Sequence, residues 1–149
     1  MNLLTINAWE TDYELTLRLH ELAAESAYLC GQNELLEQCA EKILNHAKNA
    51  LDRISIEEIR IQAYTVQNRL IEALEIAKKS LQEWGVFFPA DISFDVIQQE
   101  LKETQKCLAK FTLNELETLP KMTEVRALAS MRLLSSIIAT AYIAEPTFH

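Results

Sequence analysis

Glycine and proline are scarce in this chain, which has only two glycines and three prolines among its 149 residues. Average usage is about 7% glycine and 5% proline, so this chain has far fewer turn-forming residues than most proteins. Folds built from many short strands need frequent turns, and the sequence therefore argues against them. It predicts long helices joined by a few turns.

Positive charge is also in short supply. Fourteen lysines and arginines stand against 22 aspartates and glutamates, which leaves a formal net charge of −8 at pH 7. A phosphate backbone or an anionic membrane surface would on average repel such a chain. We therefore expect its partners to be proteins, and neither nucleic acid nor a membrane.

The three cysteines, Cys30, Cys39 and Cys107, are odd in number, and no secretory signal pattern precedes them. We therefore expect free thiols and a cytoplasmic protein. Cys30 and Cys39 flank the first predicted turn and could meet there as metal ligands, but small buried core residues are the simpler interpretation. The histidines have no second ligand at helical spacing, so we expect neither metal nor cofactor.

Long uncharged runs are limited to the C-terminal part, where residues 127–144 contain a single charge, Arg132. This stretch is near the lower length limit for a membrane span. Because Arg132 and several hydroxyl side chains interrupt this apolar run, we interpret it as a buried helix of a globular fold.

Trp9 and Trp84 are expected to act as aromatic lids over hairpin ends.

The N-terminal third has the pattern of a helical hairpin. Apolar residues recur at steps of three and four on both sides of Gly31, which predicts a helix to that residue and a second helix to about Leu51. Thr11 to Glu14 has the form of a capping box, so the first helix should begin at Thr11. Two helices joined by so short a turn pack antiparallel.

A second hairpin is predicted over residues 55–85. Residues 55–58 again have capping-box form and should begin its first helix, and a break at Asn68 separates this helix from the next, which Gly85 ends. Further helices are predicted over about 93–110, from the capping box at Thr112, and over about 123–144. The expected fold is a single all-α domain, 1–149, of about six or seven helices, with units at 11–51, 55–85 and a less regular 93–144.

Motifs for catalysis are absent from the sequence. No glycine-rich phosphate loop, dinucleotide-binding turn or kinase catalytic loop occurs. The carboxylate pairs Glu57/Glu58 and Glu115/Glu117 lie at predicted helix starts, where they complement the helix dipole rather than form an acid–base pair. A small helical enzyme or cofactor binder would need a polar cluster inside an apolar pocket, and the pattern offers none. We expect no enzymatic activity.

The two hairpins repeat each other with a period of 37 residues, measured between the turn residues Gly31 and Asn68. The second unit resembles the tetratricopeptide repeat, whose period is 34 residues. Tyr64 matches the aromatic position of the first helix, and the small positions of the second helix match Ala73, Ala77 and Ser80. In the first unit Leu36 replaces the usual alanine, and neither unit has the closing proline, so the resemblance is to a tetratricopeptide-like unit.

Four segments carry a longer resemblance: residues 9–17, 23–29, 61–64 and 131–138. They resemble the helical region of large bacterial multidomain signalling proteins. In those proteins a serine/threonine kinase domain and a signal-transduction ATPase module precede the helical region, and sensor and histidine-kinase domains follow it. The resemblance implies a non-catalytic scaffold segment of a signal-transduction kinase that acts through protein–protein contacts, in an array that continues beyond Ile143.

If the hairpins stack as a right-handed array, the first helix of each lines a concave surface. That surface is mixed in charge and mostly acidic. It could bind a basic peptide or a neighbouring helix. The simpler interpretation is that it is an ordinary solvent-exposed face of a structural spacer segment. The alternative function is a free-standing helical module that forms a homodimer through the apolar face of its last helix. The groove positions are Arg18, Glu21, Glu25, Tyr28, Glu58, Gln62 and Thr65.

Overall fold

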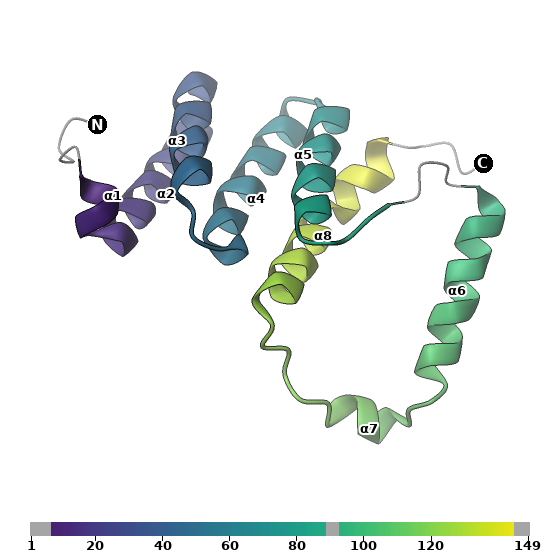
Figure 1. Ribbon diagram of the computed structural model, residues 1–149. Coiled ribbons are helices and arrows are strands. Elements are labelled where there is room, and N and C mark those ends of the chain that lie inside the picture. Colours follow the sequence, from purple (N-terminus) through teal and green to yellow (C-terminus); the bar gives the residue numbers. More distant parts are fainter. Residues whose placement is uncertain (1–6, 89–92, 145–149) are drawn as a thin grey trace. The chain divides into compact units, whose positions relative to one another are not determined.

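The computed structural model describes residues 7–88 and 93–144, which form eight helices and no strand (Figure 1). The all-α prediction is confirmed, and one helix more than the expected six or seven is present because residues 8–11 form a short helix of their own. The helices are α1 (Ala8–Thr11), α2 (Tyr13–Leu29), α3 (Asn33–His46), α4 (Ala50–Val66), α5 (Leu70–Glu83), α6 (Phe94–Leu108), α7 (Leu113–Glu117) and α8 (Val125–Ala144).

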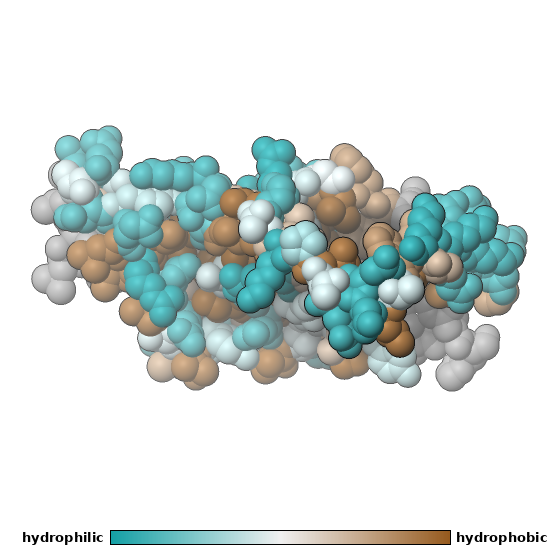
Figure 2. All heavy atoms as spheres, turned by 90° about the horizontal axis from the view of Figure 1, so that it is seen from below, coloured by the Kyte–Doolittle hydropathy of each residue, from teal (hydrophilic) through white to brown (hydrophobic). Residues whose placement is uncertain are grey.

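The chain divides into two compact units. In the described residues, the larger unit comprises 7–86 together with 124–144, and the smaller unit comprises 87–88 and 93–123. The larger unit therefore contains α1 to α5 and α8, and the smaller unit contains α6 and α7. Large apolar side chains are exposed in both units, for example Leu29 in the larger and Leu101 in the smaller. Figure 2 shows apolar residues among the polar ones on one face of the molecule.

The turns that end α2 and α4 have the same backbone structure. Gly31 has a φ of 69° and Asn68 a φ of 59°, in the left-handed region that glycine and asparagine tolerate best. In both turns this residue donates its N–H to the carbonyl three residues back, and the following residue donates to the carbonyl five residues back. The 37-residue period predicted from the sequence is thus present in the hydrogen bonding of the backbone.

Two predicted helix starts are wrong. α2 begins at Tyr13, one residue after a break at Asp12, and the Thr11 hydroxyl donates to the carbonyl of Asn7 at 3.1 Å instead of accepting from the first turn. A capping side chain works only where the residue that carries it is extended, and Asp12, which precedes α2, makes no side-chain cap.

The second misplaced start is at Ser55. α4 begins at Ala50, and its cap is Asn49, whose extended backbone lets the side-chain oxygen accept the N–H of Asp52 at 3.1 Å. Ser55 therefore lies inside α4, and the helix predicted to reach Leu51 ends at His46. Residues of capping-box type also occur inside helices. The pattern therefore favoured Ser55, although the helix is capped by Asn49.

The core of the larger unit consists of two clusters, and α4 belongs to both. Ile56 and Ala63 of α4 pack in the first cluster with α2 and α3, while Ile54 and Ile61 pack in the second with α5 and α8. Each buried aliphatic side chain contributes about 1.5–3 kcal/mol. The other members are Leu17, Ala24, Ala27, Leu36, Cys39, Ala40 and Ile43 in the first cluster, and Ala73, Ala77, Leu81, Leu133 and Ile137 in the second.

α8 packs against both α4 and α5, although about forty residues separate it from α5 in the chain. Its length and composition would suffice for a membrane span, and no other described helix meets that test. The sequence predicted a buried helix, and this holds for one side only. That side carries Ala129, Ser130, Leu133, Ile137 and Thr140, whereas Tyr142 on the other side is exposed.

In the smaller unit, the predicted start of each helix is confirmed. The Ser93 hydroxyl accepts an N–H in the first turn of α6. At α7, the Thr112 hydroxyl accepts the N–H of Glu115, and the carboxylate of Glu115 accepts the N–H of Thr112 at 2.7 Å. No residue of α6 or α7 is buried. Apolar side chains of this unit, such as Leu101, are therefore not covered by other described residues of the same unit.

Candidate interaction site

The four groove positions predicted on the first hairpin all lie on α2. Arg18 and Glu21 form an ion pair with an Nη1 to Oε2 distance of 3.1 Å. Glu25 is exposed, and Tyr28 is half-buried against the first core cluster. These positions thus comprise one exposed acid, one ion pair and one aromatic side chain that also supports the core.

The groove positions on α4 lie close to α8. Glu58 accepts a hydrogen bond from Arg132 at 2.6 Å, and the Thr65 and Thr140 hydroxyls are 3.0 Å apart. Gln62 remains exposed. Two of the three predicted α4 residues therefore contact a neighbouring helix of the same unit, which limits their availability to an external partner.

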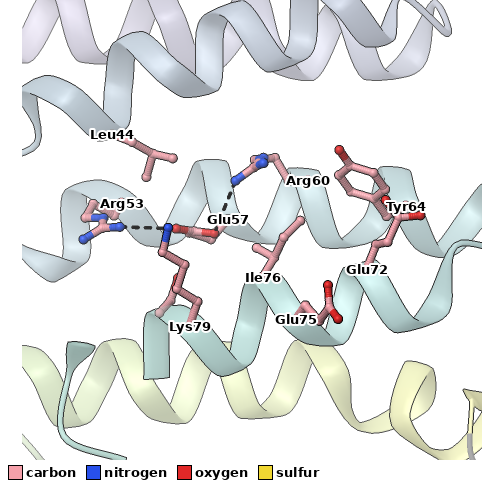
Figure 3. A pocket seen from close by; sticks show the side chains of 10 residues that line it. Leu44, Arg53, Glu57, Arg60, Tyr64, Glu72, Glu75, Ile76 and Lys79 are labelled. Atoms are coloured by element: carbon pink, nitrogen blue, oxygen red, sulfur yellow. Dashed lines mark ion pairs between the residues drawn. The ribbon is translucent and has the colours of Figure 1, made fainter. Parts of the chain in front are cut away.

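A polar pocket of about 290 Å³ opens between α3, α4 and α5 (Figure 3), and it was not predicted from the sequence. Glu57 of α4 lies in it with only 3% of its side chain exposed, 3.7 Å from Arg53 and 4.0 Å from Arg60. Its lining is completed by side chains of mixed character. These are Leu44, Tyr64, Glu72, Glu75, Ile76, Lys79 and Ser80.

Two further ion pairs connect this pocket to the neighbouring helices. Arg53 binds Glu83 of α5 at 2.5 Å, and Arg60 donates two hydrogen bonds, of 2.8 and 3.1 Å, to Glu37 of α3. The bidentate geometry fixes the angle of the guanidinium as well as its position. The series Glu37, Arg60, Glu57, Arg53 and Glu83 therefore connects three helices.

Glu57 itself is the least satisfied member of this series. Burial raises its pKa above the ordinary range, and the Ser80 hydroxyl and the two guanidinium groups oppose that rise only in part. Glu57 Oε2 and Arg53 Nε are buried without a hydrogen-bond partner in the described residues. The interpretation of Glu57 as a helix-start carboxylate is wrong because α4 begins at Ala50. The spacings Arg53 to Glu57 and Glu57 to Arg60 were the available signal.

A carboxyl group with a raised pKa in a pocket is found in catalytic sites and also in structural ion-pair networks. Here the two guanidinium groups beside Glu57 each bind a carboxylate on a neighbouring helix. The arrangement can therefore hold α3, α4 and α5 in a fixed register. That is the chemistry which the contacts of Glu57 support.

An aromatic stack closes one end of the first hairpin, as predicted for Trp9. The indole stacks on the rings of His20 and His46, with centroid distances of 5.0 and 4.6 Å. Beside it, the Tyr13 hydroxyl donates to Asp52 at 2.5 Å. Burial and this hydrogen bond raise the pKa of Tyr13 to about 12. Trp84 is half-buried against the second core cluster.

The cysteines differ in environment. Cys39 is buried in the first core cluster, and this burial raises its pKa, whereas Cys30 and Cys107 are exposed. All three are free thiols. In the described part of the chain, no group of three or more potential metal ligands comes together.

Comparison with known proteins finds a distant relative. The chain is 21% identical over 95 residues to a protein of Dictyostelium discoideum, the hybrid signal transduction histidine kinase G. The match covers 64% of this chain and 3% of the length of that protein. No protein-family model and no solved structure matches the chain. The chain is thus distantly related to a short segment of a signalling kinase.

Proposed function

We propose that this chain is a non-catalytic, helical-repeat interaction segment of a multidomain signal-transduction kinase. The observation that carries the proposal is the relation to a histidine kinase of which the matched segment is only 3%. A segment so small in proportion to the protein is the size of one module among many. Its resemblance to the helical region of bacterial multidomain kinases agrees with this position in a longer chain.

The proposed architecture is a tetratricopeptide-like, right-handed stack of hairpins. Its support is the 37-residue repeat of the turn hydrogen bonds and the position of α4, which packs on the hairpin before it and on the helix after it. In such a stack each unit contacts its sequence neighbours and leaves its side surfaces free. Free side surfaces suit a module that works by binding other proteins.

We further propose a protein partner, a cytoplasmic location and no resident cofactor. The net charge of −8 favours a basic protein surface over nucleic acid or an anionic membrane. The surface proposed for contact is the side of α2 that carries Arg18, Glu21 and Glu25, of which Arg18 and Glu25 are exposed. We place it on α2 rather than α4 because Glu58 and Thr65 already contact α8.

The test is performed in the full-length protein encoded by the gene. Glu25→Lys reverses a charge on the exposed side of α2, and Glu41→Lys makes the same change on α3, where the side chain is also exposed. We expect the first variant to reduce partner binding and kinase output at least several-fold, and the second to leave both unchanged. Equal effects of the two variants, or no effect of either, would remove the support for this surface.

The non-catalytic part of the proposal has its own test. The purified 149-residue chain should release no phosphate from ATP above the buffer rate. A steady rate that copurifies with the chain and falls in Glu57→Gln would show that the polar pocket is catalytic, and the proposal would then be wrong.

A further inference from the structure

α8 repeats α4 at a distance of 77 residues. Ile56 and Ala63 are the residues by which α4 packs on the hairpin before it, and the residues 77 positions later are Leu133 and Thr140. Both of these are buried against α4 and α5, Leu133 in the second core cluster and Thr140 beside Thr65. α8 is thus placed as the first helix of a third hairpin.

The opposite side of α8 has no equivalent cover. Ile54 and Ile61 are 0% and 1% exposed on α4, where α5 packs over them. The residues 77 positions later, Met131 and Ile138, are 54% and 68% exposed. Within the described part of the larger unit, no helix covers α8 at the place that α3 and α5 take in the first two hairpins. The open ridge consists of Ala127, Met131, Ile138, Ala141 and Tyr142, whereas Leu134 is partly buried against the second core cluster.

The open ridge has the properties of a self-complementary surface. α8 contains only two charged residues, Arg126 and Arg132, and Arg132 is directed to Glu58 on α4. Two copies of the ridge can therefore meet without placing like charges opposite each other. In an antiparallel pair with Met131 beside Ile138, the small Ala127 of one helix lies opposite the large Tyr142 of the other, so the two ridges can interdigitate at their ends.

We propose that a second copy of this chain covers the open ridge, with the two α8 helices antiparallel about a twofold axis. In the first two hairpins the second helix runs antiparallel to the first, and a twofold axis perpendicular to α8 supplies the same orientation. The two stacks then join into one, because each second core cluster continues into its copy across the paired α8 helices. The inference rests on the packing within the larger unit. In the longer protein proposed above, a following helix of the same array would compete with the second copy for this ridge.

The size of the ridge predicts a weak dimer. Its sixteen residues, 127–142, span about 24 Å, and two such helices bury on the order of 1,000 Å² in total, where specific interfaces begin. The charge of −8 on each copy opposes association, so added salt should strengthen the dimer by screening. A dissociation constant in the micromolar range is expected.

Sedimentation equilibrium of the 149-residue chain between about 1 and 200 μM tests the proposal. We expect a monomer–dimer equilibrium that Ile138→Glu weakens by about 100-fold or more, because the new charge would be buried. Leu29→Glu is the matched control, since Leu29 is an exposed apolar residue on α2, which does not pack against α8. A monomer at every concentration, or a dimer that Ile138→Glu leaves intact, would overturn the proposal.

A cross-linking experiment tests the orientation. In a Cys30→Ser, Cys107→Ser background, an antiparallel pair centred on the ridge places Met131 of one copy beside Ile138 of the other. Mixing the Met131→Cys and Ile138→Cys variants should therefore give a disulfide-linked dimer several-fold faster than either variant alone. Faster cross-linking of Met131→Cys with itself would indicate parallel helices and refute the antiparallel pair.

Discussion

Ile61 and Ile138 allow one substitution to be compared at two equivalent positions of the fold. Ile61 is 1% exposed in the second core cluster, and Ile138 is 68% exposed on the open ridge. Truncation of isoleucine to alanine removes three carbon atoms, worth about 2.4 kcal/mol in transfer free energy when the side chain is buried. The cavity left at Ile61 increases this to about 3–4 kcal/mol.

The same change at Ile138 removes carbon atoms that are already in water. We expect Ile138→Ala to lower the free energy of unfolding by less than about 0.5 kcal/mol, which is typical of a surface position. The two variants should therefore differ by about 3 kcal/mol. In a melting experiment on a chain of this size that difference corresponds to roughly 6–12 °C.

Urea denaturation followed by circular dichroism measures both variants. Tryptophan fluorescence, to which Trp9 and Trp84 both contribute, is a second probe of the larger unit. The protein is kept near 1 μM, so that association through the ridge does not add to the stability of the wild type. Equal losses at the two positions would refute the reasoning, because they would show that Ile138 is as well packed as Ile61.

Three further predictions concern the caps and the titrating groups. Asn49→Ala should lower the free energy of unfolding by about 1 kcal/mol, while Ser55→Ala, inside the same helix, should lower it by less than half as much in urea denaturation. Absorbance titration should show a phenol with a pKa of about 12 that disappears in Tyr13→Phe; in Asp52→Asn it should titrate at lower pH. Because the pKa of Glu57 is raised in the folded state, its carboxyl favours folding at low pH, and that contribution is lost as the pH rises above about 4.3. Glu57→Gln should therefore gain stability relative to the wild type between pH 4 and 7 in urea midpoints, and a constant difference across that range would contradict this sign.

Local patterns predicted the helices well because their information lies within a few residues. The turn at Asn68 could be predicted from a break in apolar periodicity, and the cap at Thr112 from a four-residue pattern. The same four-residue pattern was misleading at Thr11 and Ser55. It supplies the side chains of a capping box, but it does not ensure the extended backbone that the first residue must have. Whether that residue is extended depends on the loop before the helix.

The candidate sites depended on contacts that local patterns do not contain. The position of α8 beside α4 joins Glu58 to Arg132, 74 residues away, and no spacing rule predicts such a pair. The capping-box pattern places Glu57 at a helix start because it predicts the start of this helix at residue 55 instead of Ala50. With that error, the burial of Glu57 could not be predicted. The groove positions on α2 stay a prediction, since the structure locates them but does not test what they bind.

The route of the chain from α5 to α8 has a consequence for how this protein can vary. Both helices belong to the larger unit and pack together, yet the whole of residues 87–123 is inserted between them. The entropic cost of bringing the two ends of a connection together rises only slowly with its length. Doubling the number of residues in this connection would add only about 0.6 kcal/mol. This junction is therefore a place where relatives can gain, lose or exchange an entire module while the stacked helices on either side keep their packing.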